Sequence, residues 1–409
     1  MLILRNSRLI KELTEGFDAQ YGDVLIDGAY IADIKPVGHV FEHTFEQGQE
    51  PGQGDEPEYE ELDLQGKTLI PGLFEMHAHL YGYIYNPYEL QAMSAGKITF
   101  GAYSFAKAYL DAGYTTIRDC GSSYNCIAAI RDAISEGIIP GPRLISSGLI
   151  ITPTETGNDT FSDLYYEADG ADEVRKACRT ELQKGNDYIK IMVSGAFMNE
   201  GGNPGVQIAE YEEVKAAVDA AKMKETYVAA HCHSTESIKT AIRAGVRTVE
   251  HGTYLDDEVI EMLRGRDDCF LIPTGAIGLY CLDETNTDVS DDLLEKSKEC
   301  SAVEIANINK AYEAGLKLGF GSDIDLQAFQ AVPGYEFIAR KEYFSFHDLD
   351  ILLQATKNSA EIAGLGNMLG TVKAGKLADL IVVDGNPDED IYVMTKPVTH
   401  VFRDGKRYK

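Results

Sequence analysis

The sequence predicts an α/β protein: a (β/α)8 barrel of the TIM type with a small β-sandwich domain formed by the N- and C-terminal segments. Between residues 67 and 369, eight short apolar runs alternate with longer amphipathic segments, which is typical of parallel strands each followed by a helix. The segments 1–66 and 370–409 instead show short apolar runs separated by turns, the pattern of half-buried antiparallel strands. We therefore expect two domains, one of them assembled from both ends of the chain.

The terminal segments contain the strands of the expected sandwich. In the first 35 residues the apolar runs are Leu2–Leu4, Val24–Ile26 and Tyr30–Ile34. In the tail they are Gly370–Val372, Ala378–Val383 and Val398–Phe402. Between the two sets lies Glu46–Asp63, which is rich in acidic residues, Pro and Gly and nearly devoid of apolar residues. We interpret it as a long exposed hairpin loop or insertion without a chemical role.

The barrel strands are predicted from near-continuous apolar runs, as expected for strands that are buried on both faces. They are Thr68–His77, Thr115–Arg118, Arg143–Ser147, Tyr188–Val193, Tyr227–His231, Thr248–His251, Phe270–Pro273 and Leu318–Ser322. Amphipathic segments such as Tyr211–Met223 and Asp292–Leu316 are predicted to form helices between them.

Composition excludes several classes of partner. The 409 residues include 37 Lys and Arg against 66 Asp and Glu, a formal net charge of −29 at pH 7. Nucleic acids and anionic membranes are bound by clustered basic residues, so we expect neither as a partner. Seven scattered cysteines without a CxxC motif, and the lack of a signal-peptide core or an apolar run of about 20 residues, predict a cytoplasmic protein with reduced thiols.

Histidines give the main functional indication. The chain has nine, and four or five of them stand at the C-terminal ends of the predicted barrel strands, where barrel enzymes place their active sites. His77 and His79 end the first strand and point to the same side of it, because alternate residues of a strand share a face. They can therefore bind one metal ion together, although two partly exposed histidines would look the same.

Two further strands also end in histidine. His231 and His233 close the fifth strand and His251 the sixth, and imidazole suits Zn²⁺ and related metals. Cys232 should face the opposite side and is not expected to be a ligand. His233 lies further out, where it can contact substrate or support a ligand.

A lysine and an aspartate complete the candidate set. Lys190 lies inside the fourth apolar strand, where an unpaired ammonium group would be costly. It is either paired with a barrel carboxylate or functional, and the surrounding histidines favour a functional role. Asp323 ends the eighth strand, and a carboxylate facing several histidines fits a metal ligand that also acts as a general base.

Candidate substrate contacts come from the loops that follow the strands. Tyr83 and Tyr85 lie after the first strand, where aromatic faces with hydroxyl tips could form a pocket wall, although ordinary loop packing would explain them equally well. Thr156 follows the third strand and Ser194 the fourth. Acidic residues predominate in these loops, which favours a neutral or cationic small-molecule substrate.

Taken in order, these motifs resemble the amidohydrolase superfamily, most closely its imidazolonepropionase-related branch with the prolidase-like and Xaa-dipeptide carboxypeptidase members. The resemblance spans essentially the whole chain. It is carried by residues 69–79, 113–119, 141–148, 188–195, 229–233, 249–252, 321–323, 355–364 and 369–383.

The resemblance implies a centre of two divalent metal ions, usually zinc. His77, His79 and Asp323 would hold the buried metal, and His231 and His251 the outer one. Lys190, carboxylated by CO₂, would bridge both. The reaction would be hydrolysis of an amide bond by a metal-bridging hydroxide, with Asp323 as general base and then acid.

The chain departs from the branch near the substrate. Glu75-Met76 precedes the histidine pair where relatives commonly carry Asp-x, and residues 154–157 replace a Gly-Gly-His motif. Residues 331–337 replace a His-Gly pair after the eighth strand. All candidate metal ligands are kept while the substrate contacts differ, which supports hydrolysis with a substrate other than the usual one. We expect a dipeptide-like or N-acyl amino acid substrate, with a cyclic amide as the alternative.

Other interpretations of the chain are a catalytically silent scaffold and a deaminase. The filled ligand positions argue against a scaffold, and Lys190 argues against a deaminase, since such members usually lack the bridging lysine. Homo-oligomers are common among similar proteins.

Overall fold

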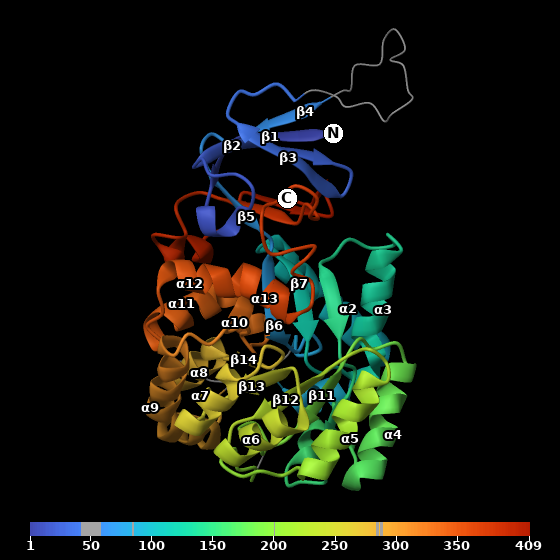
Figure 1. The fold of residues 1–409 in the computed structure, drawn as a ribbon. Helices are drawn as coiled ribbons and strands as arrows, with labels where there is room; N and C mark the ends of the chain where they lie inside the picture. The colour runs from blue at the N-terminus through green and yellow to red at the C-terminus, as the bar shows by residue number, and fades with distance from the viewer. Residues whose placement is uncertain (42–58, 84–85, 200, 284–285, 287–288) are drawn as a thin grey trace.

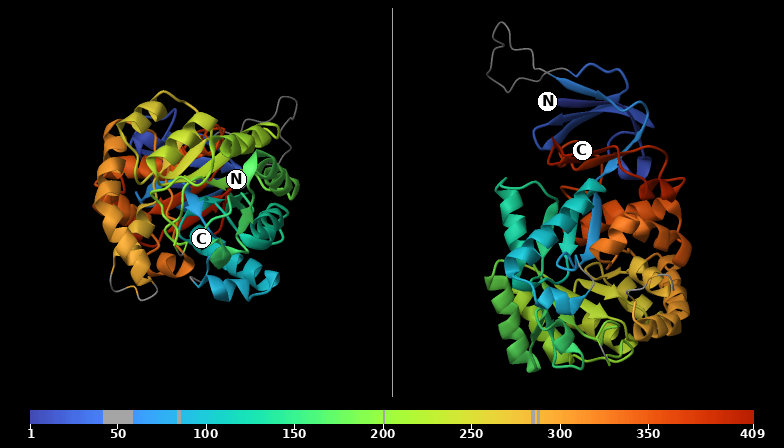
Figure 2. Two further views of the ribbon diagram at one scale, coloured as in Figure 1. Left: turned by 90° about the horizontal axis from the view of Figure 1, so that it is seen from below. Right: turned by 180° about the vertical axis from the view of Figure 1, so that it is seen from behind.

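The computed structural model describes residues 1–41, 59–83, 86–199, 201–283, 286 and 289–409. A β-sheet built from both ends of the chain lies at one end of the molecule, and the α/β part lies at the other (Figure 1). The first strands and the tail, coloured blue and red, lie side by side in both ribbon views (Figures 1 and 2).

The terminal sheet has eight strands in the order β17-β16-β15-β5-β1-β2-β3, with β4 paired to β1. Its strands are β1 (Leu2–Leu9), β2 (Tyr21–Asp27), β3 (Tyr30–Pro36), β4 (Glu60–Asp63), β5 (Thr68–Pro71), β15 (Leu380–Val383), β16 (His400–Arg403) and β17 (Lys406–Arg407). The tail and the N-terminal strands share this sheet: β15 pairs antiparallel with β5, which itself lies beside β1, and Tyr30 forms an antiparallel bridge to Leu377. Leu4, Val24, Leu380 and Phe402 share a small core on this sheet.

Two sequence predictions need correction in this sheet. The apolar run Thr68–His77 is not one strand: its first part is β5 of the terminal sheet, and its second part begins a separate strand after Gly72. The acidic segment is predicted to remain a loop as far as Asp63, but Glu60–Asp63 forms β4, parallel to β1. Residues 46–58 of that segment lie outside the described residues.

Parallel strands form the α/β part. They are arranged in a six-stranded sheet, β10-β9-β11-β12-β13-β14, and a three-stranded sheet, β6-β7-β8. The bounds are β6 (Leu73–Ala78), β7 (Tyr114–Asp119), β8 (Arg143–Ser146), β9 (Ile150–Thr152), β10 (Tyr165–Glu167), β11 (Ile189–Met192), β12 (Val228–Cys232), β13 (Thr248–His251) and β14 (Phe270–Ile272). Seven of the eight predicted strands therefore exist, and nearly all their residues are buried, as their apolar composition predicts.

The eighth predicted strand makes only isolated parallel bridges. Leu318 and Gly321 pair with residues in and after β14, and the Phe320 carbonyl accepts a hydrogen bond from the Met76 amide of β6 at 2.8 Å. This segment thus joins β14 to β6. Gly321 permits the approach, because a Cβ atom there would lie 2.7 Å from the His77 Cβ.

Helices lie outside the parallel strands (Figure 2). They are α1 (Pro87–Gln91), α2 (Ala95–Asp111), α3 (Cys126–Ser135), α4 (Gly170–Gln183), α5 (Tyr211–Lys222), α6 (Thr235–Ala244), α7 (Asp257–Arg264), α8 (Gly275–Leu282), α9 (Asp291–Glu313), α10 (Leu326–Ala331), α11 (Tyr335–Ile338), α12 (Asp348–Leu353) and α13 (Ser359–Ile362). The predicted helices at 211–223 and 292–316 correspond to α5 and α9. Among the described residues, no helix has the length and apolarity needed to cross a bilayer.

Candidate metal centre

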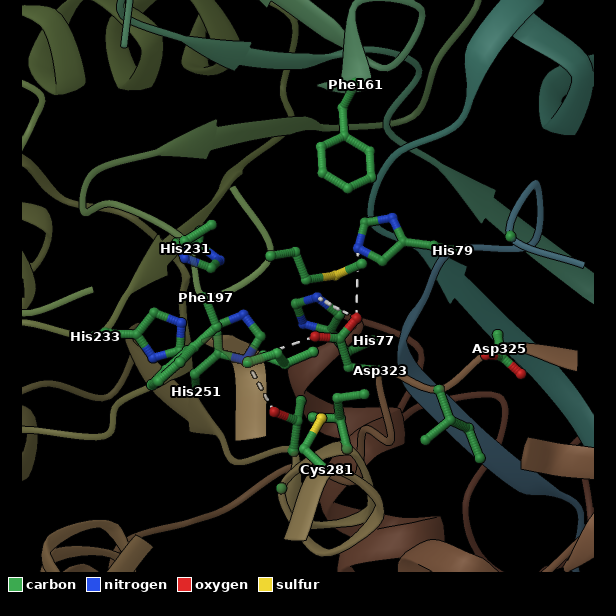
Figure 3. Close-up of a pocket in the computed structure, with 18 of the residues that line it drawn as sticks. His77, His79, Phe161, Phe197, His231, His233, His251, Cys281, Asp323 and Asp325 are labelled. Atoms are coloured by element: carbon green, nitrogen blue, oxygen red, sulfur yellow. Dashed lines mark hydrogen bonds and ion pairs between the residues drawn. The ribbon is translucent and has the colours of Figure 1, made fainter. Parts of the chain in front are cut away.

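The C-terminal ends of the parallel strands bring the predicted site residues together. β6 supplies His77, β11 supplies Lys190, and β12 and β13 supply His231 and His251. Parallel strands present their carboxyl ends at one edge, which is where α/β proteins bind ligands. Figure 3 shows the five imidazole rings and the Asp323 carboxylate directed into one shared space.

The inner part of the site is centred on His77. Its Nε2 atom lies 3.3 Å from Lys190 Nζ and 3.7 Å from Asp323 Oδ1. The same carboxylate oxygen lies 3.6 Å from Nε2 of His79, whose Nδ1 bonds the Gly121 carbonyl at 2.9 Å. Because its Nδ1 bonds a carbonyl, the His79 ring carries its proton there, and its Nε2 lone pair faces Asp323 and the cavity.

The outer part consists of three histidines. His231, His233 and His251 have nitrogen atoms within 4.8 Å of one another, and their ring centroids are 4.5–4.7 Å apart. His251 Nδ1 lies 2.8 Å from the Thr274 hydroxyl oxygen. Its Nε2 is buried and has no hydrogen-bond partner among the described residues. A buried nitrogen without a partner is costly, and a metal ion would satisfy it.

Backbone strain marks two of the candidate ligands. His251 and Asp323 have φ angles of 67° and 56°, in the left-handed region that non-glycine residues rarely occupy. Each lies where its strand ends, so the turn directs the side chain away from the regular strand path. The Asp323 amide donates to the His77 carbonyl at 2.9 Å, which fixes this turn against β6. Strain of this kind is concentrated at functional sites.

Burial sets the charge state of the cluster. Burial, with the nearby Lys190 charge as the next cause, lowers the pKa of His79 to about 4 and of His233 to about 3. Burial lowers the pKa values of His77, His231 and His251 well below their usual range. The rings are therefore neutral at pH 7 with lone pairs available, which is the form that binds metals. Burial also raises the pKa of Asp323 to about 7, against the opposing effect of Lys190.

Lys190 lacks the carboxylate partner that would explain it as a structural lysine. It is 1% exposed, and among the described residues no acidic side chain lies within 4.0 Å of its Nζ atom. Its polar neighbour is His77 Nε2. The alternative of a barrel ion pair is therefore not supported, and the lysine faces the histidine cluster instead.

A cavity opens over the cluster and is lined mainly by apolar and aromatic side chains. Phe161, Phe197 and Cys281 lie around it with the histidines (Figure 3). Tyr165 adds a hydroxyl that donates to Asn199 Oδ1 at 3.1 Å. Lys190 is the only basic Lys or Arg side chain among the described residues that line this cavity. The space can therefore hold an organic molecule with a substantial apolar part.

The other predicted substrate contacts occupy different places. His233 lines the cavity. Ser194 is buried beneath it, where its hydroxyl accepts the His233 amide at 2.9 Å. Tyr83 donates to Met93 Sδ at 2.9 Å, and neither it nor Thr156 is among the residues that line the cavity. Tyr85 lies outside the described residues. Cys232 bonds the Ser237 carbonyl on the far side of β12, as expected.

Glu75 joins β6 to the segment that ends in Asp323. Its Oε1 atom accepts the backbone amides of His77 at 2.9 Å and Ser322 at 3.0 Å. Burial raises the pKa of this carboxyl to about 8. The residue thus connects β6 to the segment that ends in Asp323 and helps to position both ligands.

Sequence reasoning missed several residues around the site. Glu250 accepts from His77 Nδ1 at 2.8 Å and pairs with Arg118 at 2.7 Å, all three side chains being buried. Glu304 and Tyr343 line the cavity from α9 and the π-helical turn Ala339–Tyr343. Glu250, like Lys190, is a charged residue within an apolar strand, and this pattern could have indicated it. Glu304 lies on a helix with many charged residues and gave no comparable indication.

Two proteins of known activity are similar to this chain in sequence. Ochratoxinase of Aspergillus niger is 29% identical over 378 residues, which is 84% of this chain and 76% of that protein. Imidazolonepropionase of Thermoplasma volcanium is 21% identical over 356 residues, 79% of this chain and 78% of that one.

Solved structures of similar proteins share the fold over the whole chain. A prolidase complexed with N-methylphosphonate-L-proline has a TM-score of 0.84 at 28% identity, covering 100% of this chain and 99% of the other. A Xaa-Pro dipeptidase with methionine in its active site has a TM-score of 0.82 at 29% identity, with coverage of 100% and 99%. The model of the amidohydrolase family matches residues 68–408. This chain therefore belongs to the amidohydrolase family and is a hydrolase that acts on carbon–nitrogen bonds.

Proposed function

We propose that the enzyme uses two divalent metal ions, zinc by the nature of the donors, to hydrolyse an amide bond. His77, His79 and Asp323 would hold one ion, and His231 and His251 the other. These five residues fit the binding of metal ions. Their side chains are brought together at one edge of the parallel strands, and the imidazole rings are neutral. His251 also has a buried Nε2 atom without a hydrogen-bond partner among the described residues. Imidazole with a carboxylate is the combination that zinc prefers.

Lys190 is proposed to be carboxylated by CO₂ and to bridge the two ions. An ammonium group 3.3 Å from His77 Nε2 would repel a metal at that nitrogen, whereas a carbamate would attract two. The lysine is buried and lacks a carboxylate partner within ion-pair distance among the described residues. The observation that carries the proposal is that this buried lysine, inside a cluster of neutral histidines, has no counter-ion in the described part of the chain.

In the proposed mechanism the ions, when bound, act as Lewis acids that polarise the scissile carbonyl and lower the pKa of the attacking water. Asp323 accepts the proton of that water and delivers it to the leaving nitrogen. The apolar walls exclude bulk water and strengthen these interactions.

The proposed substrate is a dipeptide-like molecule or an N-acyl amino acid with a large apolar part. Phe161, Phe197 and Leu164 form apolar walls within reach of the cluster. The similarity to proteins named ochratoxinase and Xaa-Pro dipeptidase supports an amide substrate.

We also propose that the two parallel sheets form one closed (β/α)8 barrel over residues 67–369. The hydrogen bonds that join 318–322 to both β14 and β6 support closure. A Ser146 carbonyl that accepts the Asp187 amide at 2.7 Å connects the two sheets on the other side. Segments 1–66 and 370–409 would form the second domain together with β5, so that the barrel would begin at β6. Seven free, buried cysteines support a cytoplasmic location.

The test combines metal analysis with a substrate panel. The purified protein should contain about two zinc-group ions per chain and hydrolyse members of a panel of Xaa-Pro and other dipeptides and N-acyl amino acids. Removal of the metal with a chelator should abolish turnover, and Zn²⁺ should restore it. A metal-free protein that refuses reconstitution, or turnover unaffected by the chelator, would refute the proposal.

A further inference from the structure

A carboxyl group of α9 faces the cavity beside the histidine cluster. Glu304 is 8% exposed and lines the cavity together with Gly278 and Tyr343. The Tyr343 hydroxyl donates to Glu304 Oε2 at 3.0 Å, and the Thr253 hydroxyl donates to Oε1 at 3.4 Å. These two neutral donors hold the carboxyl group in one orientation and leave its charge without compensation.

Two other buried acids in this protein are paired with arginine. Glu250 pairs with Arg118 at 2.7 Å, and Glu336 pairs with Arg340 at 2.6 Å. Glu304 has no basic side chain within 4.0 Å among the described residues. Burial accordingly raises the pKa of its carboxyl to about 7. A buried acid without a counter-ion at a cavity wall would be stabilised by a cation that enters the cavity.

His233 contributes a second acceptor on the same side of the cavity. Its Nδ1 lies 2.8 Å from the Thr253 hydroxyl oxygen. Because the Thr253 hydrogen is directed to Glu304, Thr253 can only accept from His233, so the ring proton is on Nδ1. The Nε2 atom of this ring is then a hydrogen-bond acceptor. The wall therefore offers an imidazole lone pair and a carboxylate, and both suit a ligand that donates hydrogen bonds.

The walls next to Glu304 suit an aliphatic chain. Ile277, Leu293, Cys281 and Cys300 also line the cavity. Gly278 keeps the space before the carboxyl group open, because a Cβ atom there would lie 3.4 Å from Glu304 Oε2 and from the Tyr343 hydroxyl. Apolar walls that lead to a fixed carboxylate match a side chain with methylenes and a terminal cation.

We propose that Glu304 determines specificity by binding the ammonium or guanidinium group of a basic side chain in the amide substrate. This rests on the proposed amidohydrolase function and narrows its substrate class to amides of lysine, arginine or similar amines. The cation would form a charge-assisted hydrogen bond to Glu304, with His233 Nε2 as a second acceptor. Asp323 and the other candidate ligands remain free for the reaction.

The test compares substrates that differ only in this charge, on the metal-loaded enzyme. Ala-Lys and Ala-norleucine form one pair, and Lys-Ala and norleucine-Ala form the other, so that either side of the bond is sampled. In wild type, one lysine substrate should exceed its norleucine partner in kcat/KM. In Glu304→Gln this preference should fall by about 10- to 100-fold, while norleucine turnover is kept. Gly278→Ala should weaken the same preference by crowding the carboxyl group.

Two controls separate the possible outcomes. Glu313→Gln, at an exposed position of the same helix, should keep the wild-type preference. Binding of free L-lysine and L-norleucine, measured by titration calorimetry on wild type and Glu304→Gln, tests the cation site without turnover. Hydrolysis of norleucine substrates with no lysine preference, or a preference unchanged in Glu304→Gln, would overturn the inference and leave the proposed function standing. Lysine binding that depends on Glu304 without turnover of any amide would support the site and refute the function.

Discussion

The Nδ1 atom of His77 lies 2.8 Å from Oε2 of Glu250, and both side chains are buried. A carboxylate can only accept, so His77 carries its proton on Nδ1 and presents the Nε2 lone pair to Lys190 and Asp323. Arg118 bonds both oxygens of Glu250 at 2.7 Å and holds that carboxylate in place. This relationship fixes the tautomer and the orientation of a candidate metal ligand.

Glu250→Gln should therefore weaken metal binding. The amide can still reach His77, but it no longer enforces the Nδ1 proton, and it leaves the buried Arg118 uncompensated. We expect metal affinity to fall by about 10- to 100-fold, measured by competition with a chromogenic chelator. Glu258→Gln, which changes an exposed acid paired with Lys239, is the matched control and should bind metal like wild type. Unchanged affinity in a folded Glu250→Gln protein would show that this hydrogen bond does not tune the ligand.

Asp323→Asn should separate metal binding from proton transfer. Asparagine retains the shape and an oxygen ligand but cannot accept a proton. We expect the variant to keep most of its metal and to lose about 10²- to 10⁴-fold in kcat on any substrate from the panel. Metal content and kcat are measured on the same preparation. Full turnover at full metal occupancy would rule out Asp323 as the general base.

Glu304 should make stability depend on pH. Its carboxyl has a pKa of about 7 when folded against a usual 4.5, so the folded state holds a proton that the unfolded state releases. Raising the pH from 4.5 to 7 therefore favours unfolding, by about 1.4 kcal/mol per pH unit and about 3 kcal/mol in total. Above pH 7 the carboxyl group is ionised in both states, so it causes no further loss of stability.

The measurement compares the free energy of unfolding of wild type and Glu304→Gln across this range. Other groups titrate in both proteins, so the difference between the curves isolates Glu304. As the pH rises from 4.5 to 7, the free energy of unfolding of the variant should increase relative to that of wild type. Above pH 7 the difference between the two proteins should stay constant. Parallel curves would mean that the carboxyl does not bury its charge on folding.

The candidate ligands could be located from the sequence because each follows an apolar run. Parallel strands meet at their carboxyl ends, so the order of runs and histidines is enough to predict that His77, His231 and His251 converge. The division of Thr68–His77 between two sheets is harder to predict. The run is apolar throughout, and only Pro71-Gly72 indicates where one strand ends and the next begins.

The supporting residues depend on tertiary contacts that no local pattern reports. Glu304 is buried because α9 packs against the turn that carries Tyr343 and against Thr253. On an amphipathic helix an acid is usually assigned to the solvent side, and here that assignment would be wrong. Tyr83 shows the converse: its loop position suggests a pocket wall, but its ring packs beside α2, where a Cβ atom at Gly101 would lie 2.1 Å from Cε1 of the tyrosine.

The carbamate at Lys190 is the central claim, and metal stoichiometry combined with carbon-13 bicarbonate labelling tests it most directly. Wild type grown or reconstituted with labelled bicarbonate should bind about two metal ions per chain and show a carbamate carbon resonance. Lys190→Met, checked by its circular dichroism spectrum and Tm to be folded, should lose that resonance, bind at most one ion tightly and lose turnover. A Lys190→Met protein that binds as much metal as wild type and hydrolyses substrate at the same rate would contradict the account.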